Sequence, residues 1–152
     1  MSGPRSTTYV HPDDVPYARL VRPYGVTEMK LIQCDLAQGL FTMVSKWEAG
    51  VQLPRHLHTG PVYAYTMEGA WRYLEYDWVA RPGAYVYEPA GTEHTLVADE
   101  PTVAMFVSSG AFIWYDEDGN MAKYQDAAST LTDVETALAA AGETLPDGVV
   151  IR

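Results

Sequence analysis

Short runs in which apolar and polar residues alternate, separated by turn residues, dominate the chain between residues 28 and 115. Successive side chains of a β-strand point to opposite faces of a sheet, so this alternation is typical of half-buried strands. Groups rich in glycine and proline, such as 48–50, 81–83 and 89–91, separate the runs. The pattern predicts about nine short strands with a turn every ~8–12 residues, which is the signature of a sandwich or barrel.

A single helical pattern follows the strands. Residues 132–135 read Thr-Asp-Val-Glu, which matches a capping box at the start of a helix. Beyond it, apolar residues fall on one helical face at Val134, Leu138 and Ala141. We therefore expect one helix near 133–141.

These patterns divide the chain into three parts. Residues 1–16 contain three prolines and no alternating run, and we interpret them as an N-terminal arm. Residues 17–119 form the predicted barrel, with 111–115 as its last strand, and residues 120–152 hold the helix and a tail. A length of 152 residues suits a single domain with one hydrophobic core.

Composition and charge exclude several classes of partner. Apolar residues make up 47% of the chain and charged residues 20%, as in ordinary globular proteins. The formal net charge of -10, without a Lys/Arg cluster, argues against nucleic acid or an anionic membrane as the main partner. No stretch approaches the ~18 apolar residues of a membrane helix, and residues 1–8 lack the apolar run of a signal peptide. We expect a cytoplasmic protein whose single cysteine, Cys34, is a buried thiol.

Two of the four histidines, His56 and His58, are separated by one residue. In a strand this spacing places both imidazoles on the same side of the sheet. Two imidazoles directed together from one strand provide half of a transition-metal site. The histidine of the proline-rich arm, His11, is expected at the surface.

The spacing around these histidines resembles the paired motifs of the cupin superfamily. The first motif matches at Gly50, His56, His58 and Gly69, and the second matches at Gly83, Pro89, Gly91 and His94. The resemblance implies a jelly-roll barrel with a metal site formed by His56, His58 and His94. Two positions depart from the pattern. Ala98 replaces the usual final asparagine, and Val62, or Tyr63 in an alternative count, replaces the usual glutamate ligand.

A closer resemblance, to the 2,4'-dihydroxyacetophenone dioxygenase family of cupins, extends over residues 50–119. The runs that carry it are 55–65, 69–80, 85–96 and 112–119. The chain is more distantly similar to acetylacetone-cleaving cupin dioxygenases. The family implies non-haem Fe(II), O2, cleavage of a carbon–carbon bond next to a carbonyl group, and a homo-oligomer, a dimer or a tetramer.

The missing glutamate bears on the substrate. Three neutral imidazoles leave the full divalent charge on a bound metal, which favours an anionic substrate that binds through two oxygens. An enolate derived from a hydroxyketone or a β-dicarbonyl compound fits this description. Fe(II) is the expected metal, although Zn(II), Mn(II) or Ni(II) can occupy such a site.

Further residues are assigned roles as hypotheses. Glu88 lies six residues before His94, where it would orient a ligand or accept the substrate proton, or else form a salt bridge at the rim. Arg72 would pair with Glu88 or hold the substrate anion, unless it faces solvent. The residues expected to line the substrate pocket are Val62, Tyr65, Arg72, Met105 and Trp114.

Two other functions remain open at this point. Three histidines and a water molecule also describe a catalytic zinc site, so a Zn(II) or Mn(II) hydrolase or isomerase is one alternative. A cupin that senses a metal or a small ligand without turnover is the other, because one fold hosts many functions. A regulator would be expected to carry a fused or docking segment. Only one short helix is expected after the barrel of this chain, which favours an enzyme over a regulator.

Overall fold

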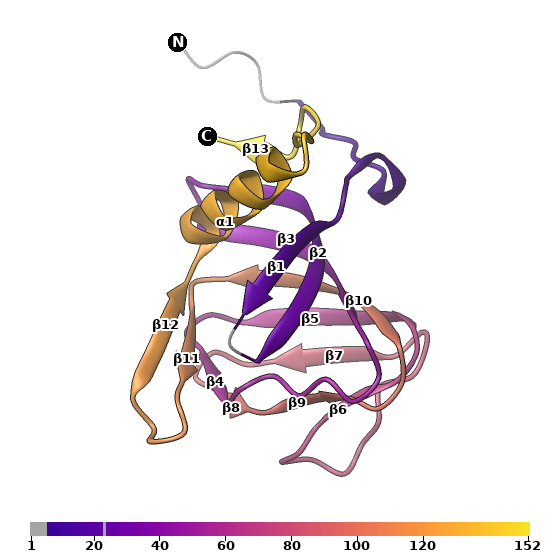
Figure 1. Ribbon diagram of the computed structural model, residues 1–152, viewed down its shortest axis with the longest axis vertical. Helices are drawn as coiled ribbons and strands as arrows, with labels where there is room; N and C mark the ends of the chain where they lie inside the picture. The colour runs from indigo at the N-terminus through magenta and orange to yellow at the C-terminus, as the bar shows by residue number, and fades with distance from the viewer. Residues whose placement is uncertain (1–5, 23) are drawn as a thin grey trace.

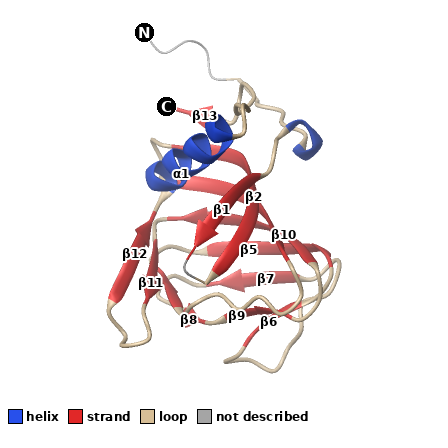
Figure 2. Cartoon of the chain, viewed as in Figure 1, coloured by secondary structure: helices blue, strands red, loops and turns tan. Residues whose placement is uncertain are grey.

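The computed structural model describes residues 6–22 and 24–152 and shows a mostly β protein with one α-helix in those residues. Three hydrogen-bonded sheets surround a common interior, and α1 (Ala127–Ala140) lies across one end of them (Figure 1). Figure 2 shows that helical structure in the described residues is confined to α1 and to the short η1 (Pro12–Asp14). This architecture confirms the predicted fold class, a mostly β barrel followed by a C-terminal helix.

The strands form one large sheet and two smaller ones. The order in the large sheet is β1 (Ala18–Arg22), β2 (Gly25–Asp35), β3 (Leu40–Trp47), β10 (Thr102–Ser109), β5 (Val62–Glu68) and β7 (Tyr85–Glu88). The short β13 (Val150–Ile151) pairs with β2. The second sheet contains β12 (Met121–Gln125), β11 (Phe112–Tyr115), β4 (His56–His58) and β8 (Glu93–His94). The third pairs β6 (Trp71–Tyr73) with β9 (Leu96–Ala98).

The inward faces of these sheets supply the core. Its largest fully buried side chains include Trp71, Tyr73, Phe41 and Leu31. The indole N–H of Trp71 donates to Thr66 Oγ1 at 2.8 Å, so the polar atom of this buried ring is satisfied. Cys34 is fully buried.

The helix begins earlier than the sequence predicts. α1 starts at Ala127 because Asp126 caps it: the Asp126 side chain accepts from the Ser129 N–H, and Ser129 Oγ accepts from the Asp126 N–H. The predicted cap, Thr132, lies inside the helix, and its hydroxyl donates to the Ala128 carbonyl oxygen at 3.2 Å. A capping box is present, as predicted, but it begins at Asp126, six residues before the predicted Thr132.

The prediction that 111–115 is the last strand is wrong. β12 follows it and pairs with β11, and β13 comes after α1. The sequence does not reveal β12 because four of its five residues are at least partly exposed, so it lacks the alternation of a half-buried strand.

The N-terminal arm packs against the barrel, although its residues 1–5 lie outside the described part of the chain. Val15 is buried, and Lys30 Nζ on β2 donates to the Pro12 carbonyl oxygen at 2.8 Å. The arm therefore covers part of the outer surface of the large sheet. In the residues that the structure describes, α1 is neither long nor apolar enough to cross a bilayer.

Candidate metal centre

Two short paired strands bring three histidines together. His56 on β4 lies directly opposite His94 on β8, and His58 lies two residues further along β4. Side chains opposite each other in an antiparallel pair share a face, and residues two apart on one strand share it too. The strand segments are joined by backbone hydrogen bonds, from His58 N to Thr92 O at 3.0 Å and from Gly91 N to His58 O at 2.7 Å. The histidines are thus presented from regular backbone.

The three imidazoles form a compact cluster. Their ring centroids are separated by 4.9 Å (His56–His58), 5.0 Å (His56–His94) and 4.8 Å (His58–His94). One nitrogen from each ring lies within 4.8 Å of the other two, and all three side chains are buried. This group has the arrangement needed to bind a metal ion.

The chemistry of these residues fits a metal ion. His56 Nδ1 lies 2.9 Å from the Pro54 carbonyl oxygen, which leaves Nε2 free for the cluster. The Nε2 atoms of His58 and His94 are buried without a hydrogen-bond partner. Leaving buried polar atoms unpaired costs free energy, and a bound cation would remove that cost.

Burial also sets the protonation state of the imidazoles. Loss of hydration lowers the pKa of His56 to about 4, of His58 to about 2 and of His94 to about 3. Near neutral pH all three rings are therefore uncharged, which is the form that binds metals.

Glu88 adds a buried carboxyl group to the cluster. Its Oε2 lies 3.4 Å from His58 Nε2, and its Oε1 lies 3.8 Å from His94 Nε2. Burial raises the pKa of Glu88 to about 8. Glu88 on β7 pairs with Val62 on β5, the position where the cupin motif would place its glutamate. The neighbouring strand therefore supplies a carboxyl group next to the position where the motif lacks one.

Tyr73 is a site residue that the sequence analysis does not single out. Its ring stacks on His94, with 3.7 Å between centroids and 9° between planes. Its hydroxyl donates a hydrogen bond to Glu88 Oε1. One side chain thus supports both a histidine and the carboxyl group beside it. No spacing signal links Tyr73 to either residue, because the contacts depend on how β6, β7 and β8 meet.

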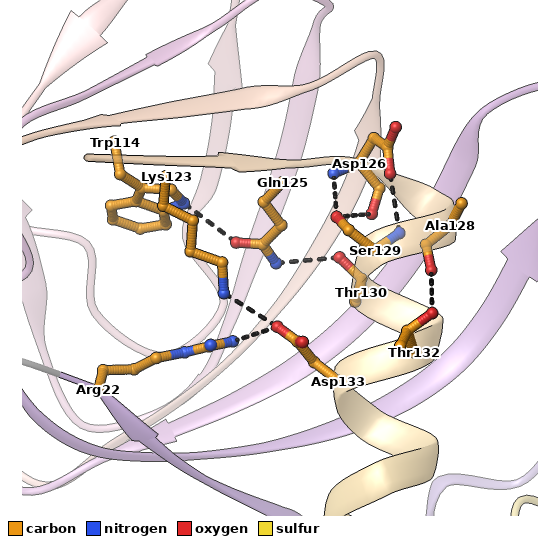
Figure 3. A network of polar contacts seen from close by, with 10 residues as sticks. All are labelled: Arg22, Trp114, Lys123, Gln125, Asp126, Ala128, Ser129, Thr130, Thr132 and Asp133. Atoms are coloured by element: carbon orange, nitrogen blue, oxygen red, sulfur yellow. Dashed lines mark hydrogen bonds and ion pairs between the residues drawn. The ribbon is translucent and has the colours of Figure 1, made fainter. Parts of the chain in front are cut away.

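A cavity of about 70 Å³ opens beside His56 and His58. Its walls are mainly apolar and aromatic, including Leu20, Met43, Phe106, Phe112 and Trp114. Trp114 lies here as expected, with its ring centroid 4.4 Å from that of His56. Its Nε1 donates to Gln125 Oε1 at 3.1 Å, and Gln125 Nε2 donates to Thr130 Oγ1 at 3.0 Å (Figure 3). This chain of hydrogen bonds holds one wall of the cavity against α1.

Four of the five predicted pocket residues do not line the cavity, and two of these four lie on the outer surface of the large sheet. Tyr65 is 51% exposed, and Met105 lies opposite it on the neighbouring strand. Both side chains point to the outer surface of the large sheet, because inward and outward positions alternate along β5 and β10. Neither lines the cavity beside the histidines.

Arg72 and Val62 were also predicted to line the pocket, and neither side chain does so. Arg72 lies between the inward-facing Trp71 and Tyr73, so it points outward, where it pairs with Asp99 at 2.8 Å instead of Glu88. The solvent-facing alternative for Arg72 is the one that the structure shows. Val62 is fully buried in the core and does not line the cavity.

The sequence and the fold are similar to those of known proteins. A family model described as the ChrR cupin-like domain matches residues 5–113. No curated protein matches the sequence. An RmlC-like cupin from Ralstonia eutropha JMP134 is 29% identical, with a TM-score of 0.87 over 97% of this chain and 96% of that one.

Two further solved structures share the architecture. A protein of unknown function with a cupin-like fold, also from Ralstonia eutropha JMP134, is 26% identical, with a TM-score of 0.85 over 99% of this chain and 94% of that one. An acetylacetone dioxygenase from Acinetobacter johnsonii is 14% identical, with a TM-score of 0.78 over 90% of this chain and 95% of that one. At 14% identity the likeness shows a common fold alone.

Proposed function

This chain belongs to the ChrR cupin-like domain family, and we propose that it is a non-haem Fe(II) dioxygenase acting on a small carbonyl compound. It would use O2 to cleave the carbon–carbon bond next to a carbonyl group in a hydroxyketone, such as 2,4'-dihydroxyacetophenone, or in a β-dicarbonyl compound. Both oxygen atoms of O2 would enter the products, which are two acids, or an acid and a keto compound.

The observation that carries this proposal is the buried group of three neutral histidines beside an apolar cavity. His56, His58 and His94 would hold the metal ion. When bound, that ion supplies Lewis acidity and a template for substrate and O2. The three neutral histidines would leave the full positive charge on a bound metal ion. That charge favours an anionic, chelating substrate over a neutral one.

Glu88 is assigned the role of proton acceptor in this proposal. Burial raises the pKa of Glu88 to about 8 when no cation is present, and the positive charge of a bound metal would lower it, leaving a carboxylate able to accept the substrate proton. Tyr73 binds Oε1, while Oε2 has no hydrogen-bond partner and lies on the side of His58. The carboxyl group is therefore held with its free oxygen directed toward the histidines, where the substrate would release its proton.

The apolar part of the proposed substrate would contact the walls of the cavity. Phe106, Phe112 and Trp114 present aromatic surface next to the histidines, and such walls exclude water. The volume of this cavity, about 70 Å³, favours a small substrate.

The proposal is tested by anaerobic purification, metal analysis, reconstitution with Fe(II) and measurement of O2 uptake. Hydroxyacetophenones and 1,3-diketones are the substrates to compare, and we expect one O2 consumed for each substrate molecule cleaved. Protein loaded with Zn(II) is the matched control and should consume no O2. Absence of O2 uptake with iron fully bound would overturn the dioxygenase assignment, and hydrolysis or isomerisation by the Zn(II) form would replace it with the alternative enzyme class.

A further inference from the structure

An uncharged, aromatic surface covers the outer face of β10, β5 and β7. We call it the tyrosine face and define it by Tyr63, Tyr65, Tyr85, Tyr87, Met105 and Val107. Strand register arranges these residues as a grid: Tyr63 lies opposite Tyr87 and Val107, and Tyr65 lies opposite Tyr85 and Met105. The outward-facing position is thus filled by tyrosine, methionine or valine at every point of the grid.

The four tyrosines are largely accessible in a single copy of the chain. Their exposed fractions are 43% (Tyr63), 51% (Tyr65), 65% (Tyr85) and 53% (Tyr87). Cross-strand aromatic pairs stabilise sheets, and the rings of Tyr63 and Tyr87 lie 5.4 Å apart. Pairing within the sheet explains why the rings are neighbours, but it leaves about half of each side chain in water.

The described part of the N-terminal arm binds β2 of the same sheet, and the tyrosines of the tyrosine face are exposed. Lys30, which binds Pro12 of the arm, lies opposite Val44 on β3, and Val44 lies opposite Met105. Val44 is only 2% exposed, whereas the tyrosines beyond β10 are open. β7 also ends the order of strands in the described sheet, so one of its edges has no partner strand there. Exposed edges are usually protected by charge or by a cover.

We propose that the tyrosine face is the surface on which a second copy of this chain docks, related by a twofold axis. The absence of charge on the grid permits contact between two acidic copies. Each copy carries a net charge of -10, which opposes self-association through charged surface, whereas the residues of the grid carry no charge and can meet without like-charge repulsion. Interfaces between identical subunits are enriched in tyrosine and methionine and depleted of charged side chains, as this surface is.

The available area agrees with a twofold dimer. A buried tyrosine contributes about 150–250 Å², so the exposed halves of four tyrosines provide roughly 400 Å² on each copy. Because a twofold contact uses the same patch on both copies, the tyrosines alone account for roughly 800 Å², and the remaining grid residues and the β7 edge bring the total near the ~1,000 Å² expected of a specific interface.

Docking here would also affect the candidate metal centre. Tyr85 and Tyr87 contribute to a second cavity, of about 370 Å³, which is bounded at its inner end by Glu88 and His94. A partner seated on the tyrosine face would cover the outer rim of this cavity and reduce the access of water to Glu88. The dimer does not depend on the proposed dioxygenase activity, and the two can fail separately.

The test is the mass of the full chain in solution, measured by sedimentation equilibrium over a range of concentrations. We expect the unchanged protein to dimerise, and Tyr65→Glu and Tyr85→Glu to weaken the dimer at least tenfold, because like charges would meet across the axis. Tyr124→Glu on β12 is the matched control, since Tyr124 is 52% exposed but lies outside the tyrosine face. Circular dichroism and metal content verify that each variant is folded.

A thiol-labelling experiment covers the case in which a glutamate variant does not fold. The natural cysteine, Cys34, is buried, so a cysteine placed on the surface is the reactive one. The thiol of Tyr85→Cys should be protected from alkylation at concentrations at which the protein is a dimer, and that of Tyr124→Cys should react at the same rate at all concentrations. A monomer at all concentrations, or an oligomer that the Tyr65→Glu and Tyr85→Glu changes leave intact, would overturn the proposal. A tetramer that falls to a dimer in these variants would support it.

Discussion

Burial, more than any direct contact, gives the histidines of this site their character. His56, His58 and His94 each lose the hydration that an imidazolium ion needs, and their pKa values fall well below 6.5. The same burial acts in the opposite direction on Glu88, whose pKa rises because its charged form is the one disfavoured. The site therefore keeps both kinds of group uncharged near neutral pH when no cation is present.

The assignment of the metal ligands predicts a selective loss of metal in variants. His94→Ala removes one of three ligand nitrogens from the cluster, so the metal content of the purified protein should fall from about one ion per chain to well below half. His11→Ala is the control, because His11 lies in the exposed arm and should leave the metal content unchanged. Elemental analysis of both variants measures the effect, and an unchanged metal content in His94→Ala would refute the assignment.

Tyr73 provides a test of how Glu88 is positioned. Tyr73→Phe keeps the ring that stacks on His94 but removes the hydroxyl that binds Glu88. We expect metal content to be retained and kcat on the best substrate to fall on the order of 10-fold, whereas Glu88→Gln, which removes the proton acceptor, should cost on the order of 10²- to 10⁴-fold.

Tyr76→Phe is the matched control for that change. Tyr76 lies near Tyr73 but is 46% exposed, so loss of its hydroxyl should leave kcat unchanged. If Tyr73→Phe were as active as the unchanged protein, the hydrogen bond to Glu88 would have no part in catalysis.

At the scale of elements, α1 joins strands from both ends of the chain. Asp133 on this helix accepts hydrogen bonds from Arg22 of β1 at 3.0 Å and from Lys123 of β12 at 2.9 Å (Figure 3). Burial alone would raise the pKa of Asp133, but the hydrogen bonds from Lys123 and Arg22 lower it. Together with the contact between Gln125 and Thr130, this ion pair network holds α1 against the strands that close the cavity.

The position of the helix start can be checked by unfolding measurements. Asp126→Ala removes the side chain that caps α1 and should lower the free energy of unfolding by about 1 kcal/mol. Thr132→Ala should change it by less than about 0.5 kcal/mol, because Thr132 is an exposed residue within the helix. Urea unfolding of both variants measures these changes. A larger loss of stability in Thr132→Ala than in Asp126→Ala would indicate that the helix begins near residue 132.

For the whole molecule, the buried titratable groups predict how stability depends on pH once metal is removed. Each of the three histidines has a lower pKa in the folded protein than in the unfolded chain, where it is near 6.5, so unfolding takes up protons below pH 6.5. Their contribution is complete above pH 6.5 and is lost progressively as the pH falls through the folded-state pKa values of about 4, 3 and 2. Glu88 has the higher pKa in the folded state, about 8 against 4.5, so its contribution is lost as the pH rises from 4.5 to 8.

The free energy of unfolding of the metal-free protein should therefore be greatest near pH 6.5. Below pH 6.5 the loss of stability from protonating three histidines on unfolding exceeds the gain from Glu88. Above pH 6.5 only the ionisation of Glu88, within this cluster, still changes the free energy of unfolding. Urea unfolding of chelator-treated protein between pH 5 and 9 measures the curve, and Glu88→Gln should remove the decline between pH 6.5 and 8. A stability that rises over that interval would contradict the predicted ionisation of Glu88.

The sequence by itself determined the β-rich class, the helical C-terminal part and the pairing of His56 with His58, whereas His94 was implied by the resemblance to the second cupin motif. These features depend on short-range patterns: alternation along single strands, the His-x-His spacing of β4, and glycine and proline at turns. The side chains of His56 and His58 share a face in any regular strand, so no knowledge of neighbouring strands was needed to pair them.

The tertiary structure alone decided which other residues meet the histidines. Glu88 faces them because β7 lies beside β5, and Tyr73 reaches both His94 and Glu88 because β6 and β8 converge. The outward direction of Tyr65 and Met105 also depends on which sheet surface faces the core. Local alternation tells which residues share a face, but only strand order and sheet closure tell which face is inside.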